Sequence, residues 1–230
     1  PRYSPKITDP MHPYWFRWII FITAAGAAAL SSATSYAGEG SLFRQENSGW
    51  FSLGTRNTLS LFNEMPEEGM GVGIGGQFRL QLGKRLNTEW YFDYLTSEVG
   101  DFAQRNDYHI GWSVMYYPGK HVDFSRLLQP YLILGHCFDY TDVFEKDNRS
   151  NHADRLSMAT QGGIGTHFNI TRALDVSLSG QYMVHFGKEV AADEHSGHTH
   201  IEVEDHTHAG GHVLLTVSAN YKFVRLWGRE

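Results

Sequence analysis

The run from His212 to Phe223 alternates between two kinds of side chain. Every second residue from Val213 is apolar or aromatic, ending in Tyr221 and Phe223, and the residues between them are mostly polar. A period of two puts the two sets on opposite faces of a β-strand. The run is long enough to cross a bilayer as a tilted strand, which takes about 9–11 residues. This pattern favours a membrane β-barrel that the run would close.

Seven earlier runs show the same alternation, each bounded by turn residues, and a helical period fits none of them. In the second run, for example, Val72, Ile74 and Phe78 fall on one face and Gln77 and Arg79 on the other. The seven runs are Trp50–Phe62, Met70–Leu82, Thr88–Val99, Tyr108–Tyr117, Tyr131–Phe144, Leu156–Phe168 and Leu174–Phe186. The sequence therefore predicts an all-β chain: an eight-stranded antiparallel up-and-down transmembrane barrel over residues 50–223.

Composition excludes several other classes. The mean hydropathy of −0.37 does not fit a bundle of transmembrane helices. It is compatible with transmembrane strands, because their apolar and polar residues alternate and offset each other in the mean. The net charge of −6 argues against nucleic acid as a partner. Cys137 is the single cysteine, which excludes an intramolecular disulfide framework and a CxxC motif.

The beginning of the sequence resembles a secretion signal. Met11 and Arg17 precede an apolar run from Trp18 to Leu30, which is followed by a small-x-small site ending at Ala37. We expect translation to start at Met11 and cleavage to follow Ala37, so that residues 1–37 are upstream residues plus a signal peptide. Residues 38–49 then form a polar periplasmic lead, and residues 224–230 a periplasmic tail that the barrel pattern does not explain.

The connections between the runs also alternate in length. With the amino terminus in the periplasm, the odd connections face outward, and the last of them, Gly187–Gly211, is the longest. Two of the even connections, Gly83–Asn87 and Asn169–Ala173, are short, as periplasmic turns are in such barrels. Pro118–Gln129 is the exception, being too long for a tight turn.

The signal segment, the alternating runs, the aromatic-ended last run and the unequal connections together resemble small outer-membrane β-barrel proteins, the class of the OmpA membrane domain, OmpX and OmpW. The resemblance covers Trp50–Phe223 and rests on pattern rather than on a sequence motif. It implies a place in the outer membrane of a Gram-negative bacterium, contact with membrane lipids and lipopolysaccharide, and insertion by the barrel-assembly machinery, which reads a last strand ending in Phe.

The inward face of the predicted barrel carries charges of both signs. An eight-stranded barrel is just wide enough for side chains to fill it, and a buried charge needs a partner. We therefore predict an interior charge network, with an ion path through the lumen as the alternative. Its members are Arg56, Arg79, Glu89, Asp93, Asp175 and Lys222.

The last outward connection is rich in histidine and acids. His-Thr-His occurs twice in it, on either side of Ile201–Asp205, and if the segment folds back the two pairs could meet. Imidazoles beside carboxylates suit Zn²⁺, Cu²⁺ or Ni²⁺. The candidate ligands are His195, His198, His200, His206, His208 and His212. The alternatives are a solvated loop without a metal role and a loop that responds to pH.

Four functions remain open at this point. The pattern favours a structural or surface-interaction protein without enzymatic activity; the others are a divalent-metal-binding surface protein, a narrow small-molecule channel and a lipid-modifying hydrolase. A hydrolase needs a serine–histidine pair, and His136 faces lipid in this register with no serine two residues away. A soluble lipocalin-like barrel would put the apolar set inside, but aromatic residues gather at the ends of the runs, as membrane girdles do.

Overall fold

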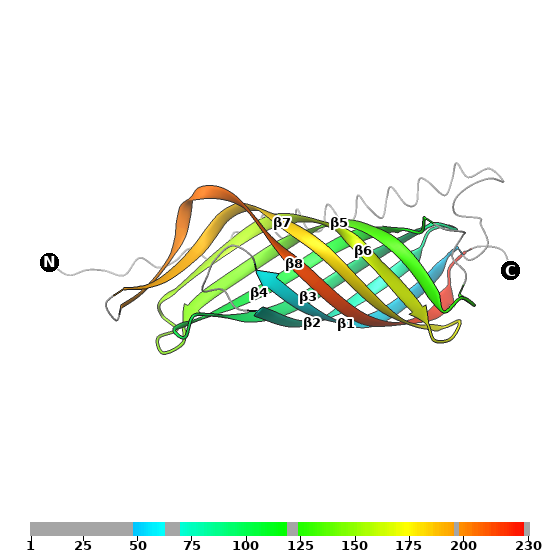
Figure 1. Ribbon diagram of the computed structural model, residues 1–230, viewed down its shortest axis with the longest axis horizontal. Coiled ribbons are helices and arrows are strands. Elements are labelled where there is room, and N and C mark those ends of the chain that lie inside the picture. The colour runs from blue at the N-terminus through cyan, green and yellow to red at the C-terminus, as the bar shows by residue number, and fades with distance from the viewer. Residues whose placement is uncertain (1–47, 63–69, 119–123, 196–197, 228–230) are drawn as a thin grey trace. The chain divides into compact units, whose positions relative to one another are not determined.

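The chain forms a single closed barrel of eight antiparallel strands (Figure 1). The computed structural model describes residues 48–62, 70–118, 124–195 and 198–227. The strands are β1 (Trp50–Phe62), β2 (Met70–Gln81), β3 (Leu86–Val99), β4 (Ala103–Tyr116), β5 (Leu128–Glu145), β6 (His152–Asn169), β7 (Leu174–His195) and β8 (His198–Arg225). Each strand pairs with the next in sequence, and β8 pairs with β1, which confirms the predicted up-and-down topology. Among the described residues no helix is long and apolar enough to cross a membrane.

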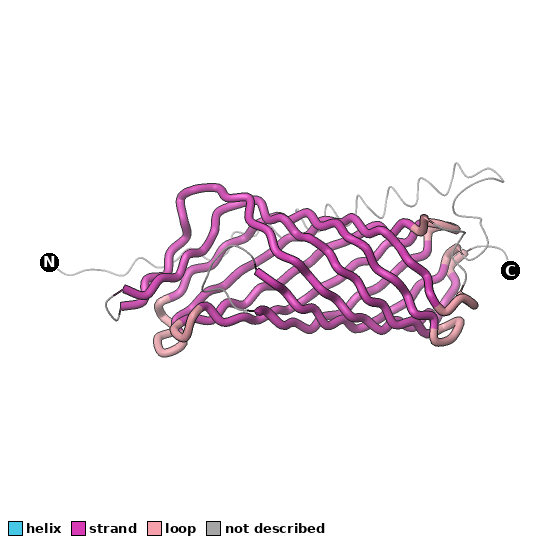
Figure 2. The backbone as a smooth tube through the Cα atoms, in the orientation of Figure 1, coloured by secondary structure: helices cyan, strands magenta, loops and turns pink. Residues whose placement is uncertain are grey.

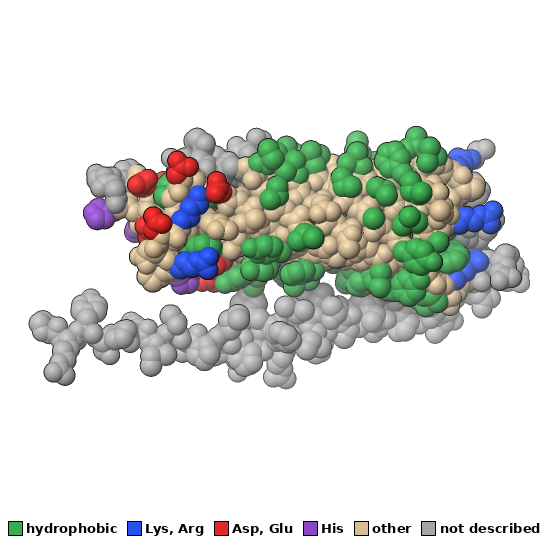
Figure 3. Space-filling model, turned by 90° about the horizontal axis from the view of Figure 1, so that it is seen from below, with side chains coloured by type: hydrophobic (Ala, Val, Ile, Leu, Met, Phe, Trp, Pro, Cys, Tyr) green, Lys and Arg blue, Asp and Glu red, His purple; other side chains and the backbone are tan. Residues whose placement is uncertain are grey.

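The alternation of polar and apolar residues in the sequence corresponds to the inner and outer faces of the barrel wall. Arg56 and Asp93 are 1 % exposed inside the barrel, whereas Ile74 and Leu134 on its outer surface are 63 % and 70 % exposed. Figure 3 shows hydrophobic side chains spread over the wall, with acidic and basic side chains gathered beyond them at one end and basic ones at the other. An apolar exterior around a polar interior is the arrangement of a membrane barrel, and it is opposite to that of a lipocalin.

The two ends of the barrel differ (Figure 2). At the end that holds Gly49 and Trp227, which we call the turn end, short turns join β2 to β3 and β6 to β7, with backbone bonds such as Gly83 N to Leu86 O at 3.1 Å. At the other end, the loop end, β7 and β8 continue together beyond the rest of the wall.

This projecting β7–β8 hairpin corrects one prediction. Residues 187–211 were expected to form a loop, but they are strand except at residues 196–197, which lie outside the described residues. The pairing continues from Gly187↔His208 to His195↔His198, with a register shift between Lys188 and Val190. Near the barrel one face of the hairpin is still buried, at Val190, Ala192 and Ile201. Toward the tip water meets both faces, so neither face must be apolar and the alternation fades.

Two segments at the turn end now have a structural role. β8 runs on to Arg225, which pairs with Trp50, and the Arg225 Nε donates to the Ser48 carbonyl at 3.1 Å, so part of the predicted tail belongs to the wall. The long connection between β4 and β5 places Phe124 against the Trp50 ring, with centroids 6.4 Å apart. The predicted signal peptide and most of the predicted lead lie outside the described residues.

Apolar side chains close the interior toward its loop end. A cluster there combines Val99, Ala103 and Val143 with three residues of the projecting hairpin, Val190, Ala192 and Ile201. Four of these six are less than 6 % exposed. The hairpin therefore packs over the mouth of the barrel through inward-facing apolar residues, and it does not merely extend into solvent.

Candidate functional site

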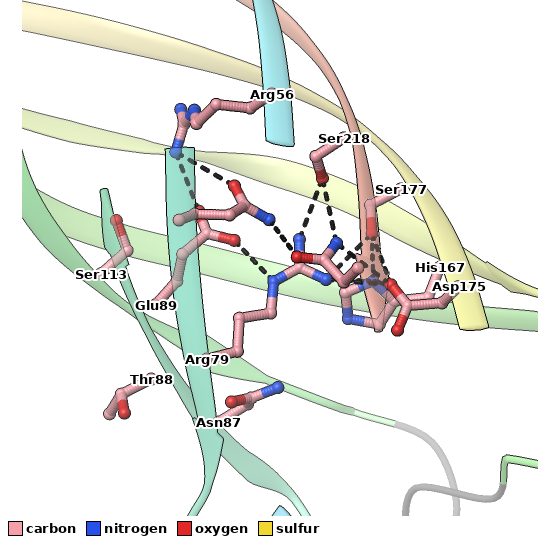
Figure 4. A network of polar contacts seen from close by, with 12 residues as sticks. Arg56, Arg79, Asn87, Thr88, Glu89, Ser113, His167, Asp175, Ser177 and Ser218 are labelled. Atoms are coloured by element: carbon pink, nitrogen blue, oxygen red, sulfur yellow. Dashed lines mark hydrogen bonds and ion pairs between the residues drawn. The ribbon is translucent and has the colours of Figure 1, made fainter. Parts of the chain in front are cut away.

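Arg79 is the centre of the charged network in the lumen (Figure 4). Its Nε lies 2.6 Å from Glu89 Oε2 on the adjacent β3, and its Nη1 lies 3.0 Å from Asp175 Oδ1 on β7. β2 and β7 are not neighbours in the wall, so this side chain crosses the lumen. Further bonds run from the guanidinium to Ser177 and Ser218 at 3.1 and 3.2 Å.

Arg56 and Lys222 complete the network on either side of Arg79. Arg56 lies 3.1 Å from Glu89 and 3.0 Å from Asp93, and its guanidinium carbon stands 4.1 Å from the centre of the Tyr91 ring. Lys222 Nζ lies 2.7 Å from Asp175 Oδ2. All six residues of the predicted interior network thus make ion pairs with one another, and their three positive and three negative charges balance.

A polar layer around His167 extends this network toward the turn end. Its Nδ1 lies 2.6 Å from Ser177 Oγ, and its Nε2 lies 2.9 Å from Tyr117 Oη. The alternation of the run Leu156–Phe168 puts His167 on the inward face but gives no sign of these partners. Ser177 is paired with His167 on the adjacent β7, and Tyr117 follows β4, 50 residues away. The contact with Ser177 is a serine–histidine pair inside the lumen, where Arg79 also binds the serine.

A second buried cluster surrounds Asp139 nearer the loop end. Its Oδ1 lies 3.3 Å from His109 Nε2, and its Oδ2 lies 2.9 Å from His185 Nδ1. The Nε2 atoms of His185 and His212 are 3.5 Å apart. All four side chains are at most 6 % exposed. His212, predicted as a metal ligand beside the His-rich segment, instead lies with these residues inside the barrel.

This cluster was not identified from the sequence, although the alternation of the runs Tyr108–Tyr117 and Leu174–Phe186 puts His109 and His185 on inward faces. The missing information was the register across strands: His109 pairs with both Asp93 and Asp139, and neither pairing can be read from one strand alone. In the part of the chain that the structure describes, no group of three or more His, Cys, Asp or Glu side chains has the arrangement of a metal site.

The other predicted ligands lie on the projecting hairpin. His198 and His200 are exposed, and His200 Nε2 lies 3.1 Å from Glu202 Oε2. The side chains of His195, His206 and His208 lie outside the described residues. Both His-Thr-His repeats are on β8, where His200 pairs with Asp193 and His208 with Gly187. The fold-back therefore does not bring the repeats opposite each other, since His200 and His206 are roughly 20 Å apart along a strand that rises about 3.3 Å per residue.

The wall shows the surroundings of His136, the histidine considered for hydrolysis, and of the inward-facing Ser113. His136 faces outward as predicted, without a bulge, and its Nδ1 lies 3.2 Å from the carbonyl oxygen of Ala159. Ser113 accepts a hydrogen bond from Gln161 Nε2 at 3.1 Å inside the barrel. Neither residue forms part of a serine–histidine pair at the lipid surface.

Comparison with solved structures finds similar barrels at low sequence identity. OprG of Pseudomonas aeruginosa matches with a TM-score of 0.52 and 16 % identity over 78 % of this chain and 98 % of that one. A major outer membrane protein of Thermus thermophilus matches with a TM-score of 0.51 and 13 % identity over 75 % of this chain and 99 % of that one. Neisserial surface protein A gives a TM-score of 0.50 and 15 % identity over 76 % and 98 %.

These identities support a conclusion about fold and no further one. No protein-family model matches the sequence, and a search of curated proteins gives no match. The polar lumen and apolar wall agree with the structural likeness. The chain has the fold of the small eight-stranded outer-membrane β-barrels, and its apolar wall is the surface that such a barrel presents to the lipid of a Gram-negative outer membrane.

Proposed function

We propose that this protein is a non-conducting outer-membrane barrel that acts at the cell surface through its loop end, above all through the projecting β7–β8 hairpin. The observation that supports this proposal is the filled lumen. Arg79 spans it from β2 to β7, and ion pairs link Arg79 on to β3 and, through Asp175, to β8. Hydrated ions have no open path through such a layer without breaking buried ion pairs.

Both ends of the lumen also support a barrel that does not conduct ions. A cavity beneath the turn end, lined by Arg79, Tyr117 and Lys222 among others, has a volume of about 20 Å³. Such a space holds about one water molecule. At the loop end, the apolar cluster formed by Val143, Val190 and Ile201 covers the polar interior. A small-molecule channel would need wider spaces than these.

Conductance across a planar bilayer tests the proposal. We expect the reconstituted protein to show no stable ohmic steps, whereas a general porin in the same bilayer does. The double variant Arg56→Ser with Asp93→Ser removes one buried pair without leaving a lone charge, and we expect it to open small, noisy conductance. Stable conductance by the unaltered protein would rule out the closed lumen.

Divalent-metal binding at the hairpin tip is the second candidate. It is supported by exposed imidazoles beside carboxylates: His200 pairs with Asp193 across the hairpin and contacts Glu202. Calorimetric titration with Zn²⁺ tests it. If the tip binds the ion, His198→Ala with His200→Ala abolishes the heat, and His206→Ala with His208→Ala leaves it nearly unchanged. Cu²⁺ and Ni²⁺ serve as parallel probes.

Two expectations from the resemblance stay predictions. Insertion by the barrel-assembly machinery fits the exposed Phe223 near the end of β8, but the strand continues beyond it to Arg225. A lipid-modifying hydrolase has the least support, because the serine–histidine contact between Ser177 and His167 is buried within the charged network and not at the lipid surface.

A further inference from the structure

The outward-facing side chains of β3, β4 and β5 change from aromatic to polar at the same level on all three strands. Cross-strand pairing puts three tyrosines in a row, Tyr94, Tyr108 and Tyr140. Tyrosines gather where a barrel wall meets the lipid headgroups. The next outward-facing row toward the loop end is polar and contains Thr96, Asn106 and Asp142. The polar row therefore lies at headgroup level, directly beyond the hydrocarbon.

A groove of about 460 Å³ opens on this surface, between the tyrosine row and the β5–β6 connection. Three kinds of side chain line it: aromatic rings, amides and charged groups. They include Tyr94 and Tyr140, Gln104 and Asn106, and Asp142 and Arg149. We call this feature the outer groove. Its volume falls in the range of small-molecule sites, which runs from about 300 to 1,000 Å³.

Hydrogen bonds hold the amides of the outer groove in place. Tyr94 Oη donates to Asn106 Oδ1 at 3.1 Å, and Gln104 Nε2 donates to the same oxygen at 3.4 Å and to Thr96 Oγ1 at 3.0 Å. These bonds use the side-chain oxygen of Asn106, so its amide nitrogen keeps two N–H donors. A fixed side chain with unused donors can bind hydroxyl or phosphate oxygens at little cost in side-chain entropy.

The charged groups of the outer groove come from β5 and the connection that follows it. The Arg149 guanidinium carbon lies 4.9 Å from the centre of the Phe144 ring, which fixes the exposed arginine over an aromatic surface. Asp142 Oδ1 lies 3.6 Å from His152 Nδ1. A planar guanidinium binds phosphate through two parallel hydrogen bonds, and a carboxylate accepts hydrogen bonds from hydroxyls.

We propose that the outer groove binds the phosphorylated sugar headgroup of a glycolipid in the outer leaflet. Arg149 binds the phosphate, the amides and Asp142 bind sugar hydroxyls, and the aromatic rings pack against the apolar face of a sugar. Because the groove opens outward just beyond the hydrocarbon, a lipid of the surrounding leaflet meets it directly. The inference rests on the loop end facing outward and is independent of whether the lumen conducts.

Lipid binding by the full barrel in micelles of an uncharged detergent tests this proposal. The probe is lipopolysaccharide that carries lipid A and inner core sugars only, titrated while retained lipid is measured by native mass spectrometry. We expect Arg149→Gln and Asn106→Ala each to raise the apparent Kd about tenfold, which corresponds to about 1.4 kcal/mol. The matched control is Arg172→Gln, which removes another exposed arginine, at the turn end, and should leave the Kd unchanged.

Two further titrations distinguish the possible sources of the phosphate group. Phosphatidylglycerol carries the phosphate without a sugar ring, and inorganic phosphate carries it without a lipid. We expect the first to bind at least about tenfold more weakly and the second not to compete at millimolar concentration. Equal binding of phosphatidylglycerol, competition by inorganic phosphate, or unchanged binding by the two groove variants would each overturn the proposal. Heat-modifiable migration on a gel confirms that every variant is folded.

Discussion

Two close side-chain contacts, one between β7 and β8 and one within β8, have similar lengths in very different surroundings. In the lumen, Lys222 Nζ and Asp175 Oδ2 are 2.7 Å apart, and their side chains are 9 % and 4 % exposed. On the projecting hairpin, His200 Nε2 and Glu202 Oε2 are 3.1 Å apart, and their side chains are 71 % and 63 % exposed. Water can replace either partner of the second pair but not of the first. Access to water, more than distance, therefore decides how much each pair matters to the fold.

The largest expected effect comes from removing the centre of the lumen network. Arg79→Ala leaves three carboxylates in the lumen with only two cations, Arg56 and Lys222, so one buried negative charge is no longer neutralised. Breaking a buried pair by removing one partner costs about 3–5 kcal/mol. We expect a loss of this size in the free energy of unfolding, measured by urea titration of the barrel in lipid vesicles with tryptophan fluorescence.

Arg172→Ala is the control for this change, because it removes an exposed arginine at the turn end. Surface substitutions of this kind stay within about 0.5 kcal/mol. If Arg79→Ala and Arg172→Ala shift the unfolding midpoint equally, water reaches the lumen network and the contrast between the two regions disappears.

A neighbouring pair of glycines tests how tightly the lumen is filled. A Cβ at Gly75 would collide with the Asp93 carboxylate and the Phe92 carbonyl, whereas a Cβ at Gly76 meets only the Gly54 carbonyl oxygen, at 3.9 Å. Overpacking costs about 1–3 kcal/mol. We expect that loss for Gly75→Ala and a change of less than about 0.5 kcal/mol for Gly76→Ala in the same titration. If Gly75→Ala leaves the free energy of unfolding unchanged, the interior can rearrange to make room for the added methyl group.

The contrast between lumen and hairpin also explains how much the sequence could predict. Where lipid lies on one side and a packed interior on the other, each residue is restricted to one kind of side chain. The strand Trp50–Phe62 was therefore predicted with its exact bounds, and Arg56 and Arg79 were placed among their partners. Toward the tip of the hairpin no such restriction acts, so paired strands were taken for a loop.

Contacts across the lumen could not be predicted from the sequence, for a different reason. A period of two tells which face a side chain is on but not how far one strand is shifted against a distant one. Asp139 and His185, on β5 and β7, lie 2.9 Å apart although 46 residues separate them, and no local pattern marks the pair. The outer groove was missed likewise, because it combines residues of four strands, β3 to β6, with Arg149 of a connection.

The smallest expected effect belongs to the exposed pair of the hairpin. Glu202→Gln removes the charge that faces His200 but keeps the size of the side chain, and an exposed pair contributes only about 0–1 kcal/mol. We expect the free energy of unfolding to change by less than about 0.5 kcal/mol, in contrast to Asp175→Asn, which removes a charge that Arg79 and Lys222 share inside the barrel. If Glu202→Gln destabilises the protein as much as Asp175→Asn, the hairpin tip must be shielded from water, and its histidines and acids would then be part of the folded barrel rather than a surface open to ligands.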